Sequence, residues 1–186
     1  MIRLSIAMIV KNESRHLDGC LRSIKGLADE LIVIDTGSTD VTIDIALSNG
    51  AAVDTFRWCD DYSAARNFSL SKCTGDWIFV IDADEQLDPG FHKTLRENIQ
   101  SGIAGVYYYA WRHHHQVGHI DDSKGWLFVN REDIRFVGRC HEKLVATGPK
   151  LVRGWCDILV HHYGFMDQQR SIEKEATYTR LMSMEG

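Results

Sequence analysis

The sequence predicts an α/β fold in which helices flank a mostly parallel central sheet. Three runs of apolar residues carry this prediction: 4–10 (LSIAMIV), 31–34 (LIVI) and 77–81 (WIFVI). Near-continuous apolar runs of strand length are typical of strands buried on both faces of a parallel sheet. Segments with helical spacing lie between the runs, and this strand–helix–strand order gives parallel strands joined by right-handed crossovers.

The first connections support this order. Residues 13–26 place apolar side chains at helical spacing and end on a glycine suited to a helix C-terminus. The second strand is followed by a tight turn at Gly37. Ser38 or Thr39 is expected to cap a helix that runs to about residue 49.

The rest of the first half follows the same alternation. Residues 51–56 are predicted to form a third strand and residues 63–72 a helix. After the fourth strand, Asp88 and Pro89 are expected to begin a helix to about residue 101, because aspartate is a good N-cap and proline fits the first helical position.

The second half is predicted to be irregular. Polar loops that carry histidines link short expected strands at 106–111, 126–130, 134–137 and 158–160. The last segment, 167–184, has the apolar spacing of an amphipathic helix.

Composition and charge narrow the class of protein. The chain has 186 residues, with 21 Lys and Arg against 26 Asp and Glu, and a formal net charge of −5. An apolar content of 44% argues against disorder, and the acidic balance argues against a nucleic-acid partner. The five cysteines include no C-x-x-C pair, so neither a disulfide framework nor a structural zinc knot is expected.

No segment of the sequence has the pattern of a membrane span. The first apolar run is only as long as a strand and is followed at once by Lys11, Asn12 and Glu13, so it is neither a signal peptide nor a spanning helix. We therefore expect a cytoplasmic protein without a transmembrane segment, for which peripheral contact with a membrane stays open.

Acidic side chains follow three of the predicted strands. Glu13 follows the first strand, Asp35 the second, and Asp82, Asp84 and Glu85 the fourth. Ligands of open parallel sheets bind at the carboxyl ends of the strands, so these side chains are expected at one binding edge. Neither G-x-G-x-x-G after the first strand nor G-x-x-x-x-G-K-[ST] is present, which argues against the usual dinucleotide fold and a phosphate loop.

Asp82 and Asp84 form the strongest of these signals. Carboxylates two residues apart at the end of an extended strand project to the same side. Paired carboxylates bind hard divalent cations, which in turn neutralise phosphate oxygens. The alternative is a solvated loop that caps the next helix.

Five motifs in this order resemble those of the family 2 glycosyltransferases. They are MIVKNE, IVIDTGSTD, WCDDYSAARNFSL, GDWIFVIDADE and HYG, and the resemblance covers roughly residues 3–165. The similarity is greatest to a bacterial branch whose catalytic domain is often followed by helical repeats. It implies transfer of a sugar from a nucleotide-diphosphate donor, typically UDP-linked, with inversion and with Mn²⁺ or Mg²⁺ as cofactor. The acceptor stays open among a saccharide, a lipid-linked glycan and a peptide.

The resemblance also implies a Rossmann-like nucleotide-diphospho-sugar transferase (GT-A) fold as a single domain over 1–186. Its parts are a nucleotide-sugar-binding half (1–102), an acceptor half (103–165) and a C-terminal helix (166–186) that can be the truncated start of a further region. An inactive nucleotide-sugar-binding module is the main alternative function. A nucleotidyltransferase is disfavoured, because the first strand is not followed by a loop rich in glycine and lysine.

On the donor side, the resemblance places the nucleotide base near Glu13 and against the backbone of Ala7, Met8 and Ile9. Asp35 matches an aspartate that accepts a hydrogen bond from the pyrimidine ring, and Arg66 matches an arginine near the nucleotide. A capping role for Asp35 and a surface ion pair for Arg66 stay open as alternatives.

The acidic motif and the late histidine complete the implied site. Asp82, with Ala83 beside it, is expected to contact the ribose or a metal-bound water. Asp84 is expected to ligate the divalent cation, and His162 of the HYG motif is expected to be a further ligand. A packed or surface role for His162 is the alternative.

The general base is expected in the second half, where Glu142 is the candidate and Asp133 and Asp121 are held in reserve. Glu142 can instead simply pair with Arg139 or Lys143.

The other polar residues receive ordinary roles. His113 to His115 are interpreted as a polar loop on the acceptor side, and His161 is expected to point to the face opposite His162. Asp60 and Asp61 are expected to cap the following helix in preference to binding the donor sugar.

Overall fold

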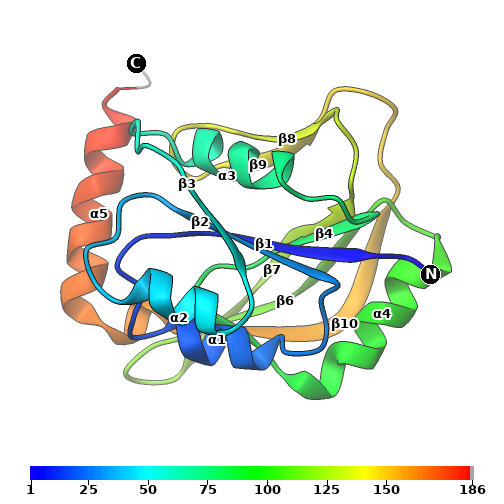
Figure 1. The fold of residues 1–186 in the computed structure, drawn as a ribbon, viewed down its shortest axis with the longest axis horizontal. Coiled ribbons are helices and arrows are strands. Elements are labelled where there is room, and N and C mark those ends of the chain that lie inside the picture. Colours follow the sequence, from blue (N-terminus) through cyan, green and yellow to red (C-terminus); the bar gives the residue numbers. More distant parts are fainter. Residues whose placement is uncertain (185–186) are drawn as a thin grey trace.

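The computed structural model describes residues 1–184, and among these the side chains of all but 168–171 and 173. A central sheet runs through the molecule, with α3 on one side and α1, α2 and α4 on the other (Figure 1). The helices are α1 (Leu17–Ser23), α2 (Thr42–Ser48), α3 (Tyr62–Ser71), α4 (His92–Ser101) and α5 (Gln168–Met182), with two 3₁₀ turns, η1 (Pro89–Phe91) and η2 (Gly164–Met166).

The eight-stranded sheet has the order β3-β2-β1-β4-β7-β6-β10-β5. Its strands are β1 (Leu4–Val10), β2 (Glu30–Asp35), β3 (Ala52–Thr55), β4 (Trp77–Val80), β5 (Glu85–Leu87), β6 (Val106–His114), β7 (His119–Val129) and β10 (Arg153–His162). The four strands predicted in the first half, β1 to β4, are all present and parallel, as expected. Across the whole sheet, four of the seven pairings are parallel and three antiparallel, so parallel pairings are in the majority and the antiparallel ones all involve strands of the second half or β5.

The second half is more regular than predicted. β6 and β7 form a long antiparallel hairpin that joins β4 to the second half of the sheet. A separate two-stranded sheet consists of β8 (Ile134–Val137) and β9 (Lys143–Ala146), and β9 was not predicted. β5 was also missed. It follows the acidic motif and pairs with β10, so the two predicted halves share one sheet.

Three helix starts differ from the sequence-based expectation. Asp88 and Pro89 begin the 3₁₀ turn η1, and α4 begins after it at His92. The helix expected over 13–26 is confined to α1. Neither Ser38 nor Thr39 caps α2; instead, an Asp40 carboxylate oxygen accepts hydrogen bonds from the backbone N–H (3.0 Å) and hydroxyl of Thr42. The expected cap of α3 is present, because Asp61 accepts from the backbone N–H of Ala64 at 2.9 Å.

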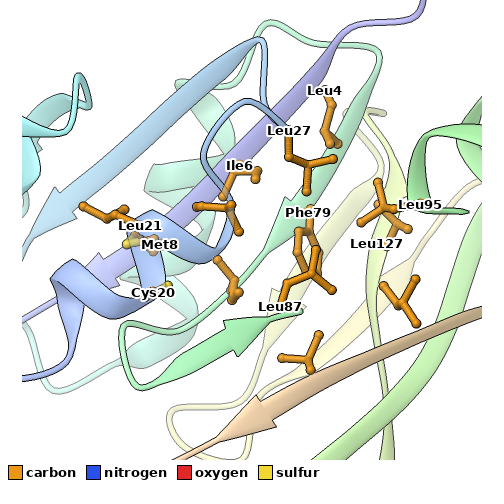
Figure 2. Packing of buried hydrophobic residues seen from close by; sticks show 14 of the residues in the cluster. Leu4, Ile6, Met8, Cys20, Leu21, Leu27, Phe79, Leu87, Leu95 and Leu127 are labelled. Carbon is orange, nitrogen blue, oxygen red and sulfur yellow. The ribbon is translucent and has the colours of Figure 1, made fainter. Parts of the chain in front are cut away.

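The core has two layers because alternate residues of a strand face opposite sides of the sheet. Ile6 and Met8 of β1 pack in the layer that also contains Leu21 of α1 and Leu95 of α4, as Figure 2 shows. Ala7 of β1 faces the other layer, with side chains of β4, β8 and α3. This packing fixes the parallel strands and therefore fixes the edge at which they end.

No helix within residues 1–184 combines the length and the apolar character that crossing a bilayer requires.

Candidate active site

The carboxyl ends of three parallel strands lie at one edge of the sheet. β1 lies between β2 and β4 and pairs with both in parallel. Asp35 is the last residue of β2 and is paired with Val10 of β1, and the acidic turn that contains Asp82 begins just after β4. The structure therefore brings together the strand ends that the sequence predicted to form a binding edge.

The predicted base-binding strand is largely enclosed. The side chains of Ala7 and Met8 are fully buried and that of Ile9 is half-buried. The backbone carbonyl of Ala7 accepts a hydrogen bond from the N–H of Ile81 at 3.2 Å. Contact of the backbone of Ala7, Met8 and Ile9 with a nucleotide base stays a prediction. Glu13 is half-buried and follows β1 at the edge.

Asp35 shapes the turn that follows β2. Its buried carboxylate accepts hydrogen bonds from the backbone N–H groups of Gly37 (2.9 Å) and Ser38 (3.1 Å). Asp35 therefore orders a loop, and it does not cap α2, which begins at Thr42. Its contact with a pyrimidine ring stays a prediction.

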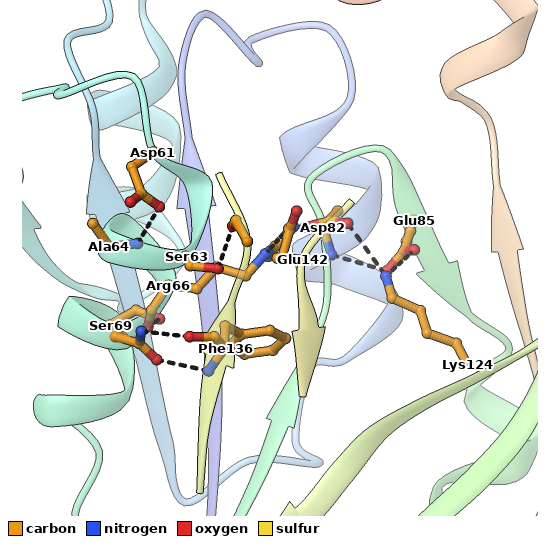
Figure 3. A network of polar contacts seen from close by, with 12 residues as sticks. Asp61, Ser63, Ala64, Arg66, Ser69, Asp82, Glu85, Lys124, Phe136 and Glu142 are labelled. Carbon is orange, nitrogen blue, oxygen red and sulfur yellow. Dashed lines mark hydrogen bonds and ion pairs between the residues drawn. The ribbon is translucent and has the colours of Figure 1, made fainter. Parts of the chain in front are cut away.

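Asp82 is held by two buried cations (Figure 3). The Oδ1 atom lies 2.9 Å from Nη2 of Arg66, and the Oδ2 atom lies 3.2 Å from Nζ of Lys124. The side chains of Arg66 and Lys124 are 6% and 5% exposed, whereas that of Asp82 is 25% exposed. Asp82 is therefore the member of this cluster that a ligand can reach.

Arg66 also holds the predicted base, Glu142, to whose Oε1 its Nε donates a hydrogen bond. The guanidinium lies 4.3 Å from the ring centroid of Trp126, and the Glu142 side chain is buried. His141, the preceding residue, has a left-handed φ of 51°, which few residues other than glycine adopt. Glu142 thus contacts Arg66 of the first half of the chain, and Arg66 links it to Asp82.

The reserve candidates for the base are paired elsewhere. Asp133 forms an ion pair with Arg131 at 2.7 Å, and Asp121 forms one with Arg112 at the same distance.

Lys124 is a site residue that sequence reasoning missed. Its Nζ donates to Oε1 of Glu85 at 2.6 Å and lies 3.6 Å from the ring centroid of Trp126. Lysine is almost never buried without a charged partner. A single lysine in a polar segment has no characteristic spacing, so only the tertiary pairing reveals it.

Asp84 and His162 meet at the other end of the acidic turn. The Oδ2 atom of Asp84 lies 3.5 Å from Nε2 of His162, and both side chains are buried. The N–H of Tyr163 donates to the carbonyl of Asp84 at 2.8 Å, which ties β10 to the turn. A Cβ at Gly164 would lie 2.5 Å from Oδ2 of Asp84 and 2.8 Å from Nε2 of His162, so glycine leaves room beside both atoms.

This pair fits a divalent cation. A carboxylate oxygen beside an imidazole nitrogen is a donor set that suits Mn²⁺. Within the part of the chain that the structure describes, no three His, Cys, Asp or Glu side chains are arranged around one ion position. Asp84 and His162 are the residues that would hold such a cation.

Histidines of β6 and β10 pair on both faces of the sheet. Nδ1 of His113 lies 3.0 Å from Nδ1 of His162, and Nε2 of His114 lies 2.8 Å from Nδ1 of His161. His161 therefore points away from His162, as predicted. The loop predicted over His113 to His115 was wrong for the first two, because β6 extends to His114.

The carboxylates of the acidic turn differ in their protonation. Burial raises the pKa of Asp82, but Arg66 and Lys124 outweigh it and hold that pKa well below its usual range. Burial likewise opposes ionisation of Asp84, and the adjacent His162 keeps the pKa of Asp84 low. At Glu85, burial dominates over the attraction of Lys124 and raises the pKa. Asp82 and Asp84 therefore both favour the ionised form.

Residues 5–153 match the family model described as glycosyl transferase family 2. The chain belongs to this family. A TPR repeat-containing protein of Synechococcus elongatus is 39% identical over 174 residues, which are 89% of this chain and 43% of that protein. The chain spans 42–43% of the length of the first curated relatives that it matches.

Solved structures show that the GT-A fold of this family is present. Staphylococcus aureus TarS (1–349) in complex with UDP-GlcNAc is similar at a TM-score of 0.56 and 19% identity, over 63% of this chain and 36% of that one. Glucosyl-3-phosphoglycerate synthase of Mycobacterium tuberculosis, in complex with Mn²⁺ and UDP-glucose, has a TM-score of 0.51 and 27% identity. That match covers 61% of this chain and 44% of the synthase.

Proposed function

We propose that this family 2 domain transfers a sugar from a UDP-sugar to an acceptor nucleophile, with inversion and with a divalent cation as cofactor. One observation carries the proposal. The acidic turn after β4 meets Arg66 of the nucleotide-binding half and Lys124 of the second half, and Arg66 links it to Glu142. Solved relatives with UDP-GlcNAc or with Mn²⁺ and UDP-glucose support the donor class.

Asp84 and His162 would hold the cation, since they adjoin each other beside the space left by Gly164. Held by these two residues, a cation would supply positive charge against the diphosphate of the donor. Asp82 is partly exposed and is held through both oxygens, so it can accept a hydrogen bond from a ribose hydroxyl without reorienting.

Glu142 would accept the proton of the attacking acceptor group. An inverting transfer needs a base on the acceptor side of the sugar, and a carboxylate fixed by Arg66 can fill this role. The aromatic ring of Trp126 stacks on Arg66 and so limits its movement. We further propose a cytoplasmic location, since all five cysteines are free thiols.

The first test is ligand-induced stabilisation. UDP at a hundredfold excess over its Kd stabilises a binding-competent fold by about 2.7 kcal/mol, which for a chain of this length is a rise of roughly 5–11 °C in Tm. We expect this rise with Mn²⁺, a smaller rise with EDTA, and no Mn²⁺ effect in Asp84→Ala. Asp18→Asn, a change at a solvent-accessible carboxylate on α1, is the matched control and should behave as the parent does.

The second test separates an enzyme from a binding module. Glu142→Gln should retain UDP affinity and lose sugar transfer by at least about a hundredfold, the usual contribution of a general base. Transfer at the parental rate would reject Glu142 as the base. UDP binding without hydrolysis or transfer, over a panel of UDP-sugars and saccharide, lipid-linked and peptide acceptors, would instead indicate an inactive module.

A further inference from the structure

We propose that Lys124 is a positioning residue that sets the shape of the acidic turn 82–85 and so orients Asp82 toward the donor. The effect on donor binding rests on the proposed function, whereas the effect on the conformation of the turn does not. The carbon stem and ammonium of Lys124 are 5% exposed, so the ammonium has little access to a donor. Any effect of Lys124 on catalysis must therefore pass through the side chains that it contacts.

The ammonium of Lys124 contacts two carboxylates and two aromatic rings. It donates to Oε1 of Glu85 at 2.6 Å and to Oδ2 of Asp82 at 3.2 Å. The rings of Trp126 and Trp111 also lie close to it, with centroids 3.6 Å and 4.7 Å from Nζ. Since two carboxylates and two aromatic faces surround it, the ammonium is confined to one position.

These contacts close a ring around the turn. Oε2 of Glu85 accepts a hydrogen bond from the backbone N–H of Asp82 at 2.9 Å, and the N–H of Glu85 donates to the carbonyl of Asp82, also at 2.9 Å. The ammonium of Lys124 bridges the carboxylates of Asp82 and Glu85 and so completes this ring of contacts (Figure 3). The turn conformation and the Asp82 rotamer are therefore set together.

Lys124 and Arg66 act differently on Asp82. Arg66 is shared between Asp82 and Glu142, whereas the ion pairs of Lys124 are both to residues of the turn. Each cation holds one oxygen of Asp82, so loss of Lys124 frees the carboxylate to rotate about its bond to Cβ. Residues that orient the ligands of a metal ion typically contribute about 10–100-fold to metal affinity or activity, and we expect an effect of this order for Lys124.

The test compares three variants of the chain. Lys124→Met keeps the length of the side chain and removes the charge. The double variant Lys124→Met with Glu85→Gln also removes the buried carboxylate charge, while the glutamine oxygen can still accept from the N–H of Asp82. Lys72→Met, at a half-exposed ion pair with Asp54, is the matched control and should leave both measurements below unchanged.

The measurements are amide hydrogen exchange of residues 82–85 and the affinity for UDP with Mn²⁺. Lys124→Met should exchange at least about tenfold faster and bind UDP at least about tenfold more weakly. The double variant should recover thermal stability and keep both defects, and the KM for a UDP-sugar should rise by more than kcat falls. The double variant also serves as the test if Lys124→Met does not fold.

The proposal would be overturned if the double variant had the same hydrogen-exchange rates and the same UDP affinity as the parent, because Lys124 would then only balance the charge of Glu85. Faster exchange in a chain whose parent binds no UDP would refute the proposed function and leave the role of Lys124 in the turn intact.

Discussion

Arg66 connects the two halves of the chain through buried ion pairs, and its removal is therefore expected to destabilise the fold. The side chains of Arg66 and Glu142 are 6% and 7% exposed, so solvent screens their interaction little, while Asp82 at 25% is screened more. Arg66→Met leaves two carboxylates without this partner. Breaking a buried pair in this way costs about 3–5 kcal/mol, or roughly 6–20 °C in Tm for a chain of this length.

Urea unfolding followed by circular dichroism measures this loss. In the double variant Arg66→Met with Glu142→Gln, part of the loss should be recovered, with a coupling energy of about 0.5–3 kcal/mol. Arg22→Met, which breaks an exposed ion pair with Asp18, should change stability by less than about 0.5 kcal/mol. A loss below about 1 kcal/mol for Arg66→Met, as for a surface pair, would show that Arg66 is not buried between these carboxylates in solution.

Three further predictions concern other positions. Gly125→Ala should destabilise the fold by about 1–3 kcal/mol in urea unfolding, because its Cβ would lie 2.7 Å from the ring of Tyr108; an unchanged midpoint would contradict that packing. Gly164→Ala should weaken Mn²⁺-dependent UDP binding at least about tenfold in calorimetry, since its Cβ would lie 2.5 Å from Oδ2 of Asp84; parental affinity would argue against a cation there. The hydrogen bond from the backbone N–H of Leu4 lowers the pKa of Asp29 in the folded protein. The ionised Asp29 therefore stabilises the fold at pH values above its unfolded pKa near 4, and this stabilisation is lost as the pH falls through the lower folded pKa. Asp29→Asn should therefore reduce stability at pH 7 and flatten the acid limb of a pH titration of unfolding; an equal loss at pH 7 and pH 2 would refute this.

The fold of the first half could be predicted because its strands are buried on both faces. In β1, every residue but Ile9 is buried, and such a run stands out in the sequence without any tertiary information. β5 and β9 have only three and four residues, too few to show a period. The hairpin of β6 and β7 extends past its apolar part into residues such as His114 and Asp121, where cross-strand pairing replaces apolar alternation.

The site residues that directly follow a predicted strand could be predicted from the sequence. Asp82 and Asp84 follow a buried strand directly, so their place at the edge could be inferred from sequence alone. The partners of these residues come from far along the chain, since Lys124 is 42 residues from Asp82. Sequence patterns therefore identified the carboxylates, and only the folded structure shows which cations hold them.

The pairing of β5 with β10 has a consequence for how this site is assembled. The acidic turn follows β4 and leads into β5, and β5 is hydrogen-bonded to β10, the last strand in the sequence. A fragment ending at residue 102 would contain both aspartates of the turn but would lack Lys124, Glu142 and His162. Synthesis from the N-terminus thus produces the acidic motif early, whereas its contacts with β10 can form only after β10 has been synthesised. A fragment divided near residue 102 would therefore lack the ion pair of Asp82 with Lys124 and the contact of Asp84 with His162, while it would keep the ion pair of Asp82 with Arg66.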